Sequence, residues 1–349
     1  EFRRVLFRSH GACGVASGTR ARSARVNLDT ALTRHAHIAT PIIGGPMYPC
    51  SNPELVAAVS EGGGIGIVQP VTLTFVHKLE FREGLRRVRA RTGRPFGMNA
   101  LIEKSSKRHL ERMREWVDVA LEEGVRFFVT SLGDPRWVCD TVHAVGGVVY
   151  HDVTEAKWAA KARDGGADGL IAVNRRAGGH AGPRDPRELL DELQPFGLPV
   201  VCAGGVGDAA GFVEALRLGY AGVQCGTRFI ATPECDASAS YKQALLDADA
   251  DDVVLTERIT GVPVAVLDTP VIRRMGLKAN ALERWLLRNP RTKHLIRTSF
   301  VLRSVFKLRD GASREASQLW QAGKSVATID RIESAGDIVR AWAQAAREA

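Results

Sequence analysis

The chain has 349 residues, of which 45% are hydrophobic and 25% charged, so it can bury a full-size core as one large domain or two. Its formal net charge is +9, but residues 35–272 hold 25 Lys and Arg against 30 Asp and Glu, which argues against nucleic-acid binding by this central part. No apolar run approaches the roughly 18 residues needed to cross a membrane.

The first 34 residues differ from the rest of the chain. They contain seven Arg and two acidic residues and show no clear periodicity, and they lack the apolar core of a secretory signal. Their Arg-rich, acid-poor composition is compatible with an organellar transit peptide, whereas residues 5–9 resemble translated vector sequence. We expect residues 1–34 to be disordered or non-native and to lie outside the fold.

Between residues 41 and 230, short apolar runs alternate with amphipathic segments. The runs are continuously apolar, as in parallel strands buried on both faces. Helix-start signals stand between them, and Ser51–Glu54 and Asp185–Glu188 both read as capping boxes. The eight predicted strands are Pro41–Gly44, Ile65–Val68, Phe96–Leu101, Arg126–Thr130, Val148–His151, Gly169–Val173, Pro199–Ala203 and Gly222–Gly226.

Eight strand–helix units in series favour an α/β fold of the closed (β/α)8 TIM-barrel type over residues 35–272. A doubly wound open sheet is the alternative, but it normally carries G-x-G-x-x-G after its first strand. Here the glycine-rich stretch 62–66 precedes a strand instead. The barrel is therefore the predicted architecture.

The cysteines indicate a reducing compartment. The chain has six, at positions 13, 50, 139, 202, 225 and 235, with no C-x-x-C pair and no metal-ligand spacing. Cysteines in apolar runs usually pack as small hydrophobic side chains. We therefore expect a cytoplasmic protein without a metal site.

Three glycine-rich stretches follow predicted strands: 177–182, 203–208 and 224–228. The last two follow the seventh and eighth strands, where barrels often bind phosphate through backbone N–H groups and a helix N-terminus. Thr227 adds a hydroxyl. The alternative is that these glycines only form tight turns, but two such runs at the expected strands favour a phosphate site.

His180 is the candidate catalytic residue. It stands at a strand end with Gly178, Gly179 and Gly182 around it, and a histidine there can take a proton or donate a hydrogen bond. His151 also ends a strand and either reaches the site or supports the fold. Cys225 lacks an identifiable partner base, so packing beside a ligand is a better interpretation for it than nucleophilic attack.

Two further strand ends fit a planar ring. Pro46 and Met47 follow the first strand, and Asn99 on the third offers a donor and an acceptor to a heterocycle edge. Core packing for Met47 and a turn role for Asn99 are the alternatives. Together with the phosphate loops, these residues fit flavin mononucleotide (FMN).

The assembled motifs resemble the nitronate monooxygenase family of FMN enzymes. The matching segments are 45–47, 63–66, 168–169, 177–182, 203–206, 224–229 and, near the C-terminus, 319–326. The resemblance implies a TIM barrel that binds FMN non-covalently and oxidises alkyl nitronates with dioxygen. It also implies that FMN is held by Asn99, Gly178, Gly204, Gly205 and the residues Gln224, Cys225, Gly226 and Thr227, with His180 facing the substrate.

The sequence departs from the family pattern at a few positions. Some members have Gln seven residues before the histidine, where this chain has Val173, and Met is more usual than Cys225. These departures leave FMN as the expected cofactor and bear on the identity of the substrate. Two enzymatic alternatives remain: an FMN-dependent NAD(P)H:quinone or enoyl-thioester reductase, and a flavin-free barrel acting on a phosphorylated metabolite. A non-enzymatic interaction protein is the least favoured interpretation.

The C-terminal part divides into two segments. Residues 273–314 hold 12 Lys and Arg against two acidic residues and alternate bulky apolar with cationic side chains. Such a helical segment can contact an anionic membrane, cover the flavin or, as we prefer, pack on the barrel as a solvated basic helix. Residues 315–349 are expected to form closing helices, with Ile338, Val339 and Trp342 on a docking face.

Overall fold

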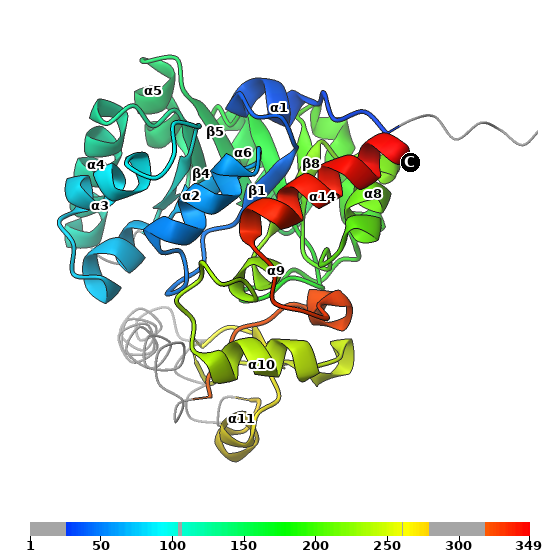
Figure 1. Ribbon diagram of the computed structural model, residues 1–349. Coiled ribbons are helices and arrows are strands. Elements are labelled where there is room, and N and C mark those ends of the chain that lie inside the picture. The colour runs from blue at the N-terminus through cyan, green and yellow to red at the C-terminus, as the bar shows by residue number, and fades with distance from the viewer. Residues whose placement is uncertain (1–25, 104–106, 260, 279–317) are drawn as a thin grey trace, which may run out of the picture.

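The computed structural model describes residues 26–103, 107–259, 261–278 and 318–349. Within them, eight parallel strands close into a barrel in chain order (Figure 1). This confirms the predicted (β/α)8 fold, and two strands agree with the prediction at both ends. The strands are β1 (Ile42–Gly44), β2 (Ile65–Val68), β3 (Gly97–Leu101), β4 (Phe127–Ser131), β5 (Val148–Val153), β6 (Gly169–Val173), β7 (Val200–Ala203) and β8 (Gly222–Cys225).

Helices connect the strands and cover the outside of the barrel. One of the two predicted capping boxes is supported, because the Glu188 carboxylate accepts from the Asp185 backbone N–H at 3.2 Å. The other is wrong: Asn52 is the N-cap, and the Ser51 hydroxyl accepts from the Met47 N–H in the preceding turn. The helices are α2 (Pro53–Glu61), α3 (Phe81–Arg89), α4 (Lys107–Glu122), α5 (Arg136–His143), α6 (Ala156–Asp164), α7 (Pro186–Leu193) and α8 (Ala209–Leu218), with short turns η1 (Thr72–Val76) and η2 (Gln194–Phe196).

The barrel interior is a packed core of alternate strand residues. Tyr150 on β5 fills much of it, and Gly169 on the next strand makes room, since a Cβ there would lie 2.2 Å from the Tyr150 ring. The intervening residues face the surrounding helices. The inward strand residues of this core are Ile43, Ile65, Ile67, Phe127, Val129, Tyr150, Ile171, Val201 and Ala203.

A short helix, α1 (Ala31–Ala36), packs against one end of this interior. Its Leu32 is fully buried among the inward strand residues, and the Thr30 hydroxyl donates to the Ala221 carbonyl at 2.6 Å. The expected boundary after residue 34 therefore cuts through an element of the fold. Because α1 has only six residues, the periodicity of the sequence does not reveal it.

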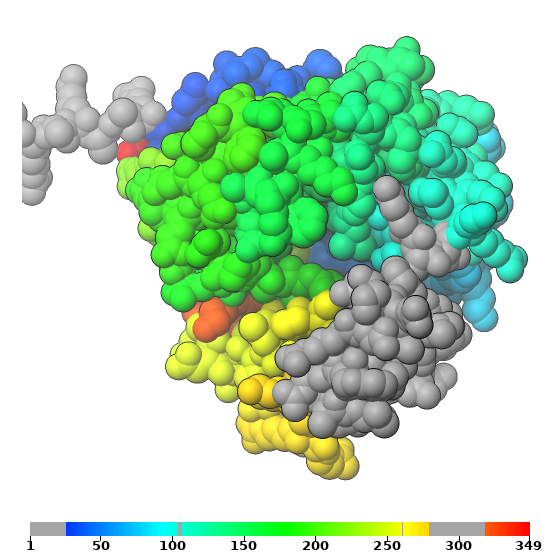
Figure 2. Space-filling view, turned by 180° about the vertical axis from the view of Figure 1, so that it is seen from behind, coloured from blue at the N-terminus to red at the C-terminus, as the bar shows by residue number. Residues whose placement is uncertain are grey.

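A second, smaller unit lies at the opposite end of the barrel and was not anticipated from the sequence. It contains the antiparallel pair β9 (Val253–Thr256) and β10 (Val264–Leu267). Figure 1 places it below the barrel, and Figure 2 shows its yellow residues against the green barrel rim with a hollow between them. Its helices are α9 (Thr227–Ile230), α10 (Ala239–Asp247) and α11 (Pro270–Met275), with the turn η3 (Ala250–Asp252).

The chain then returns to the barrel through a closing segment, residues 319–326, which includes the start of η4 (Lys324–Thr328). The predicted docking helix is present as α14 (Ala335–Glu348), which packs on α2 and α8 and buries Ile338, Val339 and Trp342. Residues 279–314, most of the predicted basic segment, lie outside the described residues. None of the described helices is long and apolar enough to span a bilayer.

Candidate active site

The carboxyl ends of the barrel strands form a mouth lined by inward polar side chains. Four of these side chains carry a buried oxygen without a hydrogen-bond partner among the described residues. Buried polar atoms are normally paired, so a cluster of orphaned oxygens at one end of a barrel indicates a polar ligand. The four oxygens are Gln69 Oε1 after β2, Asn99 Oδ1 on β3, Asp152 Oδ1 on β5 and Gln224 Oε1 on β8.

Two residues of this group, Gln69 and Asp152, were not singled out from the sequence, and Asp152 is the titratable one. It follows Tyr150 by two positions on β5 and therefore points inward. Burial raises the pKa of its carboxyl to about 7, while a hydrogen bond from the Gln224 side chain opposes the rise. An acidic residue inside an apolar strand run was the available signal, but the neighbouring His151 drew attention instead.

His151 lies on the outer face of the barrel, not in the mouth. Its Nδ1 is 2.7 Å from the Thr130 hydroxyl of the neighbouring strand, and the residue is 4% exposed. Burial lowers the pKa of His151 to about 4, so the ring is neutral at physiological pH. Of the two roles left open for it, the structure supports the structural one.

His180 lies on the loop after β6, where the structure holds the backbone firmly. The preceding Gly179 adopts a positive φ of 68° and exchanges two backbone hydrogen bonds with Ala265 of β10, at 3.3 and 2.7 Å. The His180 side chain is exposed to solvent, yet it is surrounded by enough protein that desolvation lowers its pKa. A neutral imidazole on such a loop is suited to accept a proton or donate a hydrogen bond.

The loop after β7 lies beside the loop after β6. Gly204 and Gly205 have φ values of 117° and 85°, a region that favours glycine. The buried Asn174 amide donates to the Gly204 carbonyl at 2.9 Å, and the Asn174 carbonyl oxygen accepts from the Arg176 N–H at 2.8 Å. The Asp208 side chain then caps α8 by accepting from Gly211 at 2.8 Å.

The end of β8 brings the loop after β1 into the mouth. Gly45 donates to the Cys225 carbonyl at 2.9 Å, and a Cβ on Gly226 would lie 3.3 Å from the Met47 sulfur. The Cys225 side chain points away from the mouth into the outer core, and burial raises the pKa of its thiol. Cys225 is therefore a neutral packing residue whose backbone, not its sulfur, borders the mouth.

The closing segment completes this end of the barrel. The Thr227 hydroxyl accepts from the Gly323 N–H at 3.0 Å, and Lys324 donates to the Arg176 carbonyl at 2.8 Å. Gly178 and Gly323 pass so closely that a Cβ on Gly178 would lie 2.9 Å from the Gly323 nitrogen. Glycine at these two positions therefore allows the loop after β6 and the closing segment to pass close to each other.

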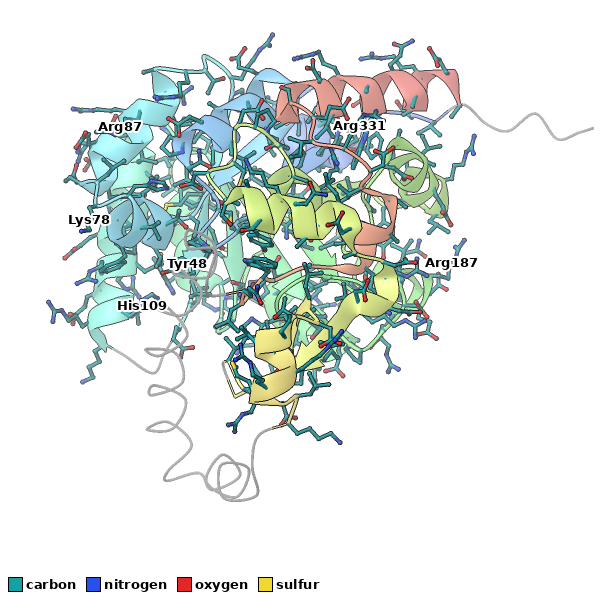
Figure 3. All side chains as sticks on the ribbon, turned by 60° about the horizontal axis from the view of Figure 1, so that its bottom comes forward. Tyr48, Lys78, Arg87, His109, Arg187 and Arg331 are labelled. Carbon is teal, nitrogen blue, oxygen red and sulfur yellow. The ribbon has the colours of Figure 1, made fainter. Side chains whose placement is uncertain are left out.

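Figure 3 looks towards this end of the molecule. Tyr48, which follows Met47, lies inward of Arg87 and Arg187, which project from the periphery. Tyr48 packs against the core of the small unit, including Val264 and Val266. The loop after β1, the small unit and the closing segment therefore surround one common mouth.

A cavity of about 990 Å³ lies elsewhere, between residues 26–31 and the starts of β7 and β8. This is the amino end of the strands, opposite the mouth. Functional loops of (β/α)8 barrels are found at the carboxyl end of the strands. The cavity is therefore not assigned to the active site.

Comparison with known proteins shows the family to which the chain belongs. The family model for nitronate monooxygenase matches residues 29–344. The chain belongs to the nitronate monooxygenase family. It is an enzyme of the flavin-dependent oxidoreductase type, as the resemblance predicted.

Individual relatives divide between different activities. A nitronate monooxygenase of Pseudomonas aeruginosa is 32% identical over 272 residues, covering 66% of this chain and 77% of the relative. A (3aS,4S,5R,7aS)-5-hydroxy-7a-methyl-1-oxo-octahydro-1H-indene-4-carboxyl-CoA dehydrogenase of Rhodococcus jostii is 32% identical over 254 residues, covering 72% and 69%. Among solved structures, FabK of Thermotoga maritima has a TM-score of 0.76 and 28% identity, covering 92% of this chain and 97% of that one.

Proposed function

We propose that this protein is an FMN-dependent enzyme that oxidises alkyl nitronates with dioxygen. The observation that carries the proposal is the cluster of orphaned polar oxygens inside the barrel mouth, next to a loop that presents His180. The unpaired oxygens suit a ligand that brings an N–H donor, as a flavin ring does, and the His180 imidazole offers a donor to a small anion such as a nitronate. Family membership supplies the reaction class.

The residues of the mouth fit a flavin. The heterocyclic edge of a flavin carries an N–H donor between two carbonyl acceptors, which suits a side-chain amide with an unpaired oxygen, such as that of Asn99 or Gln224. Pro46 and Met47 lie beside Gly226 and offer an apolar surface to the ring. The residues that would hold the flavin are Pro46, Met47, Asn99, Gly178, Gly179, Gly204, Gly205, Gln224, Cys225, Gly226 and Thr227, with Cys225 contributing its backbone.

The phosphate of FMN would lie between the loops after β7 and β8. Because Gly204 and Gly205 have no side chains, a ligand can approach the backbone there. Helix α8, which has ten residues, begins after them. A helix N-terminus and convergent N–H groups favour an anion. The dinucleotide form of the cofactor would need a second phosphate site, which the described residues of this mouth do not show.

When bound, FMN would supply the redox chemistry, taking electrons from the substrate for transfer to dioxygen. The protein would contribute orientation and electrostatics. His180, neutral at physiological pH, would donate a hydrogen bond to the oxygens of a nitronate or accept the proton from the carbon of a neutral nitroalkane. The small unit and the closing segment would restrict water at the mouth.

A second candidate is an FMN-dependent reductase that uses NAD(P)H to reduce a quinone or an enoyl thioester. It is favoured by the structural similarity to FabK and by the CoA dehydrogenase, which is 32% identical to this chain, as the nitronate monooxygenase is. The two functions differ in the electron donor.

Two measurements test the proposal. Protein purified as expressed is denatured by heat and the released chromophore identified by chromatography against FMN and FAD standards. Oxygen consumption is then measured with preformed propionate-3-nitronate. We expect FMN and nitronate-dependent oxygen uptake; a colourless protein, or oxygen uptake that requires NADH, contradicts the proposal.

A further inference from the structure

We propose that Asp152, paired with Gln224 across the barrel mouth, is a positioning residue that makes the site's acceptance of an anionic substrate depend on pH. The inference rests on the proposed function, because it concerns how that site treats a nitronate. The proposed function above gives no role to Asp152, and this inference assigns one.

Asp152 lies on β5 and Gln224 on β8, strands that are not neighbours in the barrel, and both residues are at inward register positions, opposite Ile171 and Ile43. Asp152 Oδ1 and Gln224 Oε1 are buried and have no hydrogen-bond partner among the described residues. Both oxygens are on inward side chains at the carboxyl end of their strands and are available to a ligand that enters the mouth.

The described groups around Asp152 are uncharged or neutral near pH 7. Its register partner on β6, Ile171, is uncharged, and His151, which pairs with Thr130 of β4, points outward. His180, on the loop after β6, has a lowered pKa and is neutral near pH 7. The resolved influences on Asp152 are burial and Gln224, so no described cation compensates its negative charge when it ionises.

The consequence is a carboxyl group that changes charge in the working pH range. With a pKa of about 7, Asp152 is mostly neutral and a hydrogen-bond donor below that value, and an uncompensated anion above it. An anionic substrate next to an ionised carboxylate is disfavoured by like-charge repulsion in a poorly solvated site. A neutral nitroalkane does not experience this repulsion.

The test compares the wild type with Asp152→Asn, which retains an amide partner for Gln224 but does not titrate. The value of kcat/KM for preformed nitronate is measured from pH 6 to pH 9 on FMN-loaded protein. If only the neutral carboxyl accepts the anion, the wild-type value falls about tenfold for each pH unit well above the pKa. Asp152→Asn is expected to show no such fall, whereas Asp140→Asn, an exposed control on α5, is expected to keep it.

A second variant separates positioning from a merely structural role. Replacing Gln224 with Leu removes the hydrogen bond that opposes the rise in pKa, so the loss of nitronate turnover is expected to move to higher pH. The visible spectrum of the bound flavin gives a readout without turnover: wild type is expected to titrate near pH 7 and Asp152→Asn is not. Titration in the wild type supports the inference even if Asp152→Asn fails to fold.

The outcomes distinguish this inference from the proposed function. Nitronate turnover with the same pH profile in wild type and Asp152→Asn overturns the role of Asp152 and leaves the proposed function intact. Absence of nitronate turnover at every pH overturns the proposed function, and the flavin spectrum still tests Asp152. A spectrum that does not titrate near pH 7 in the wild type contradicts the inference.

Discussion

The hydroxyl oxygen of Thr227 accepts a buried hydrogen bond from the backbone N–H of Gly323 at 3.0 Å, across 96 residues of sequence. Thr227 directly follows the mouth residues of β8, and Gly323 belongs to the closing segment. This bond therefore ties the last strand-end loop to the part of the chain that returns after the small unit. The integrity of the mouth depends on residues that are distant in sequence.

Thr227→Val is expected to lower the free energy of unfolding by about 1–3 kcal/mol, because it leaves the buried Gly323 N–H without an acceptor. Thr227→Ser keeps the hydroxyl and is the matched control. Denaturant unfolding of both variants, with and without added FMN, measures the effect. Equal stability of the Val and Ser variants would show that the bond contributes little.

Gly178→Ala is expected to destabilise the protein by about 1–3 kcal/mol and to weaken flavin retention. Its Cβ would lie 2.9 Å from the Gly323 nitrogen and 3.0 Å from the Ala322 carbonyl carbon, so the closing segment has to move. Gly93→Ala is the control, since nothing lies within 4 Å of a Cβ there. If both variants retain flavin and stability equally, the close packing of the closing segment is unimportant.

The two strand-end histidines are expected to respond differently to substitution. His180→Ala should keep the yellow cofactor but lose most turnover, because the ring is exposed on the loop after β6 and takes no part in the described core. His151→Gln should keep turnover and lose stability, because it disturbs the Thr130 contact. Absorbance and initial rates measure both; a colourless His180→Ala would identify that residue as a cofactor ligand first.

Turnover of a neutral nitroalkane is expected to fall in acid as His180 becomes protonated. Its lowered pKa places this fall below 6.5, the ordinary value for histidine. The pH dependence of kcat/KM measures it. A fall centred above pH 6.5 would indicate that another group provides the base.

Asp152 and His151 are expected to contribute to stability with opposite pH dependence. His151 has a lowered pKa, so its contribution is present above pH 6.5 and is lost as the pH falls towards 4, by roughly 3 kcal/mol at 1.36 kcal/mol per pKa unit. Asp152 has a raised pKa, so its contribution is present below about pH 3.8 and is lost as the pH rises to about 7, by about 4 kcal/mol on the same basis.

Between pH 4 and pH 6.5 these two contributions oppose each other in the wild type. Relative to wild type, unfolding stability of Asp152→Asn should therefore increase as the pH rises, and that of His151→Gln should decrease. Denaturant unfolding of the apoprotein at a series of pH values measures both without any cofactor. Parallel curves for the wild type and both variants would contradict the assigned pKa directions.

The fold was predictable because the barrel leaves a strong pattern in the sequence. Parallel strands buried on both faces produce continuous apolar runs, and these runs locate all eight strands to within two residues at each end. The glycines at strand ends are equally local signals, since a residue such as Gly204 with φ of 117° has few alternatives. Both the apolar runs and the strand-end glycines are recognised from residues that are neighbours in the sequence.

The orientation of side chains and the long-range contacts were not predictable. The directions of His151 and Asp152 depend on strand register, which a one-residue change reverses, and the sequence gives no marker for it. The β9–β10 unit and helix α1 are short, and they are stabilised by contacts with distant parts of the chain such as Gly179 with Ala265. Short elements of this kind lack a periodic signal.

An anaerobic visible spectrum of the purified protein tests whether a bound flavin takes electrons from a nitronate. One sample receives propionate-3-nitronate and another receives NADH or NADPH. We expect a bound flavin whose visible absorbance decreases with the nitronate alone. Bleaching by the nicotinamide alone, or a protein without flavin absorbance, would contradict it.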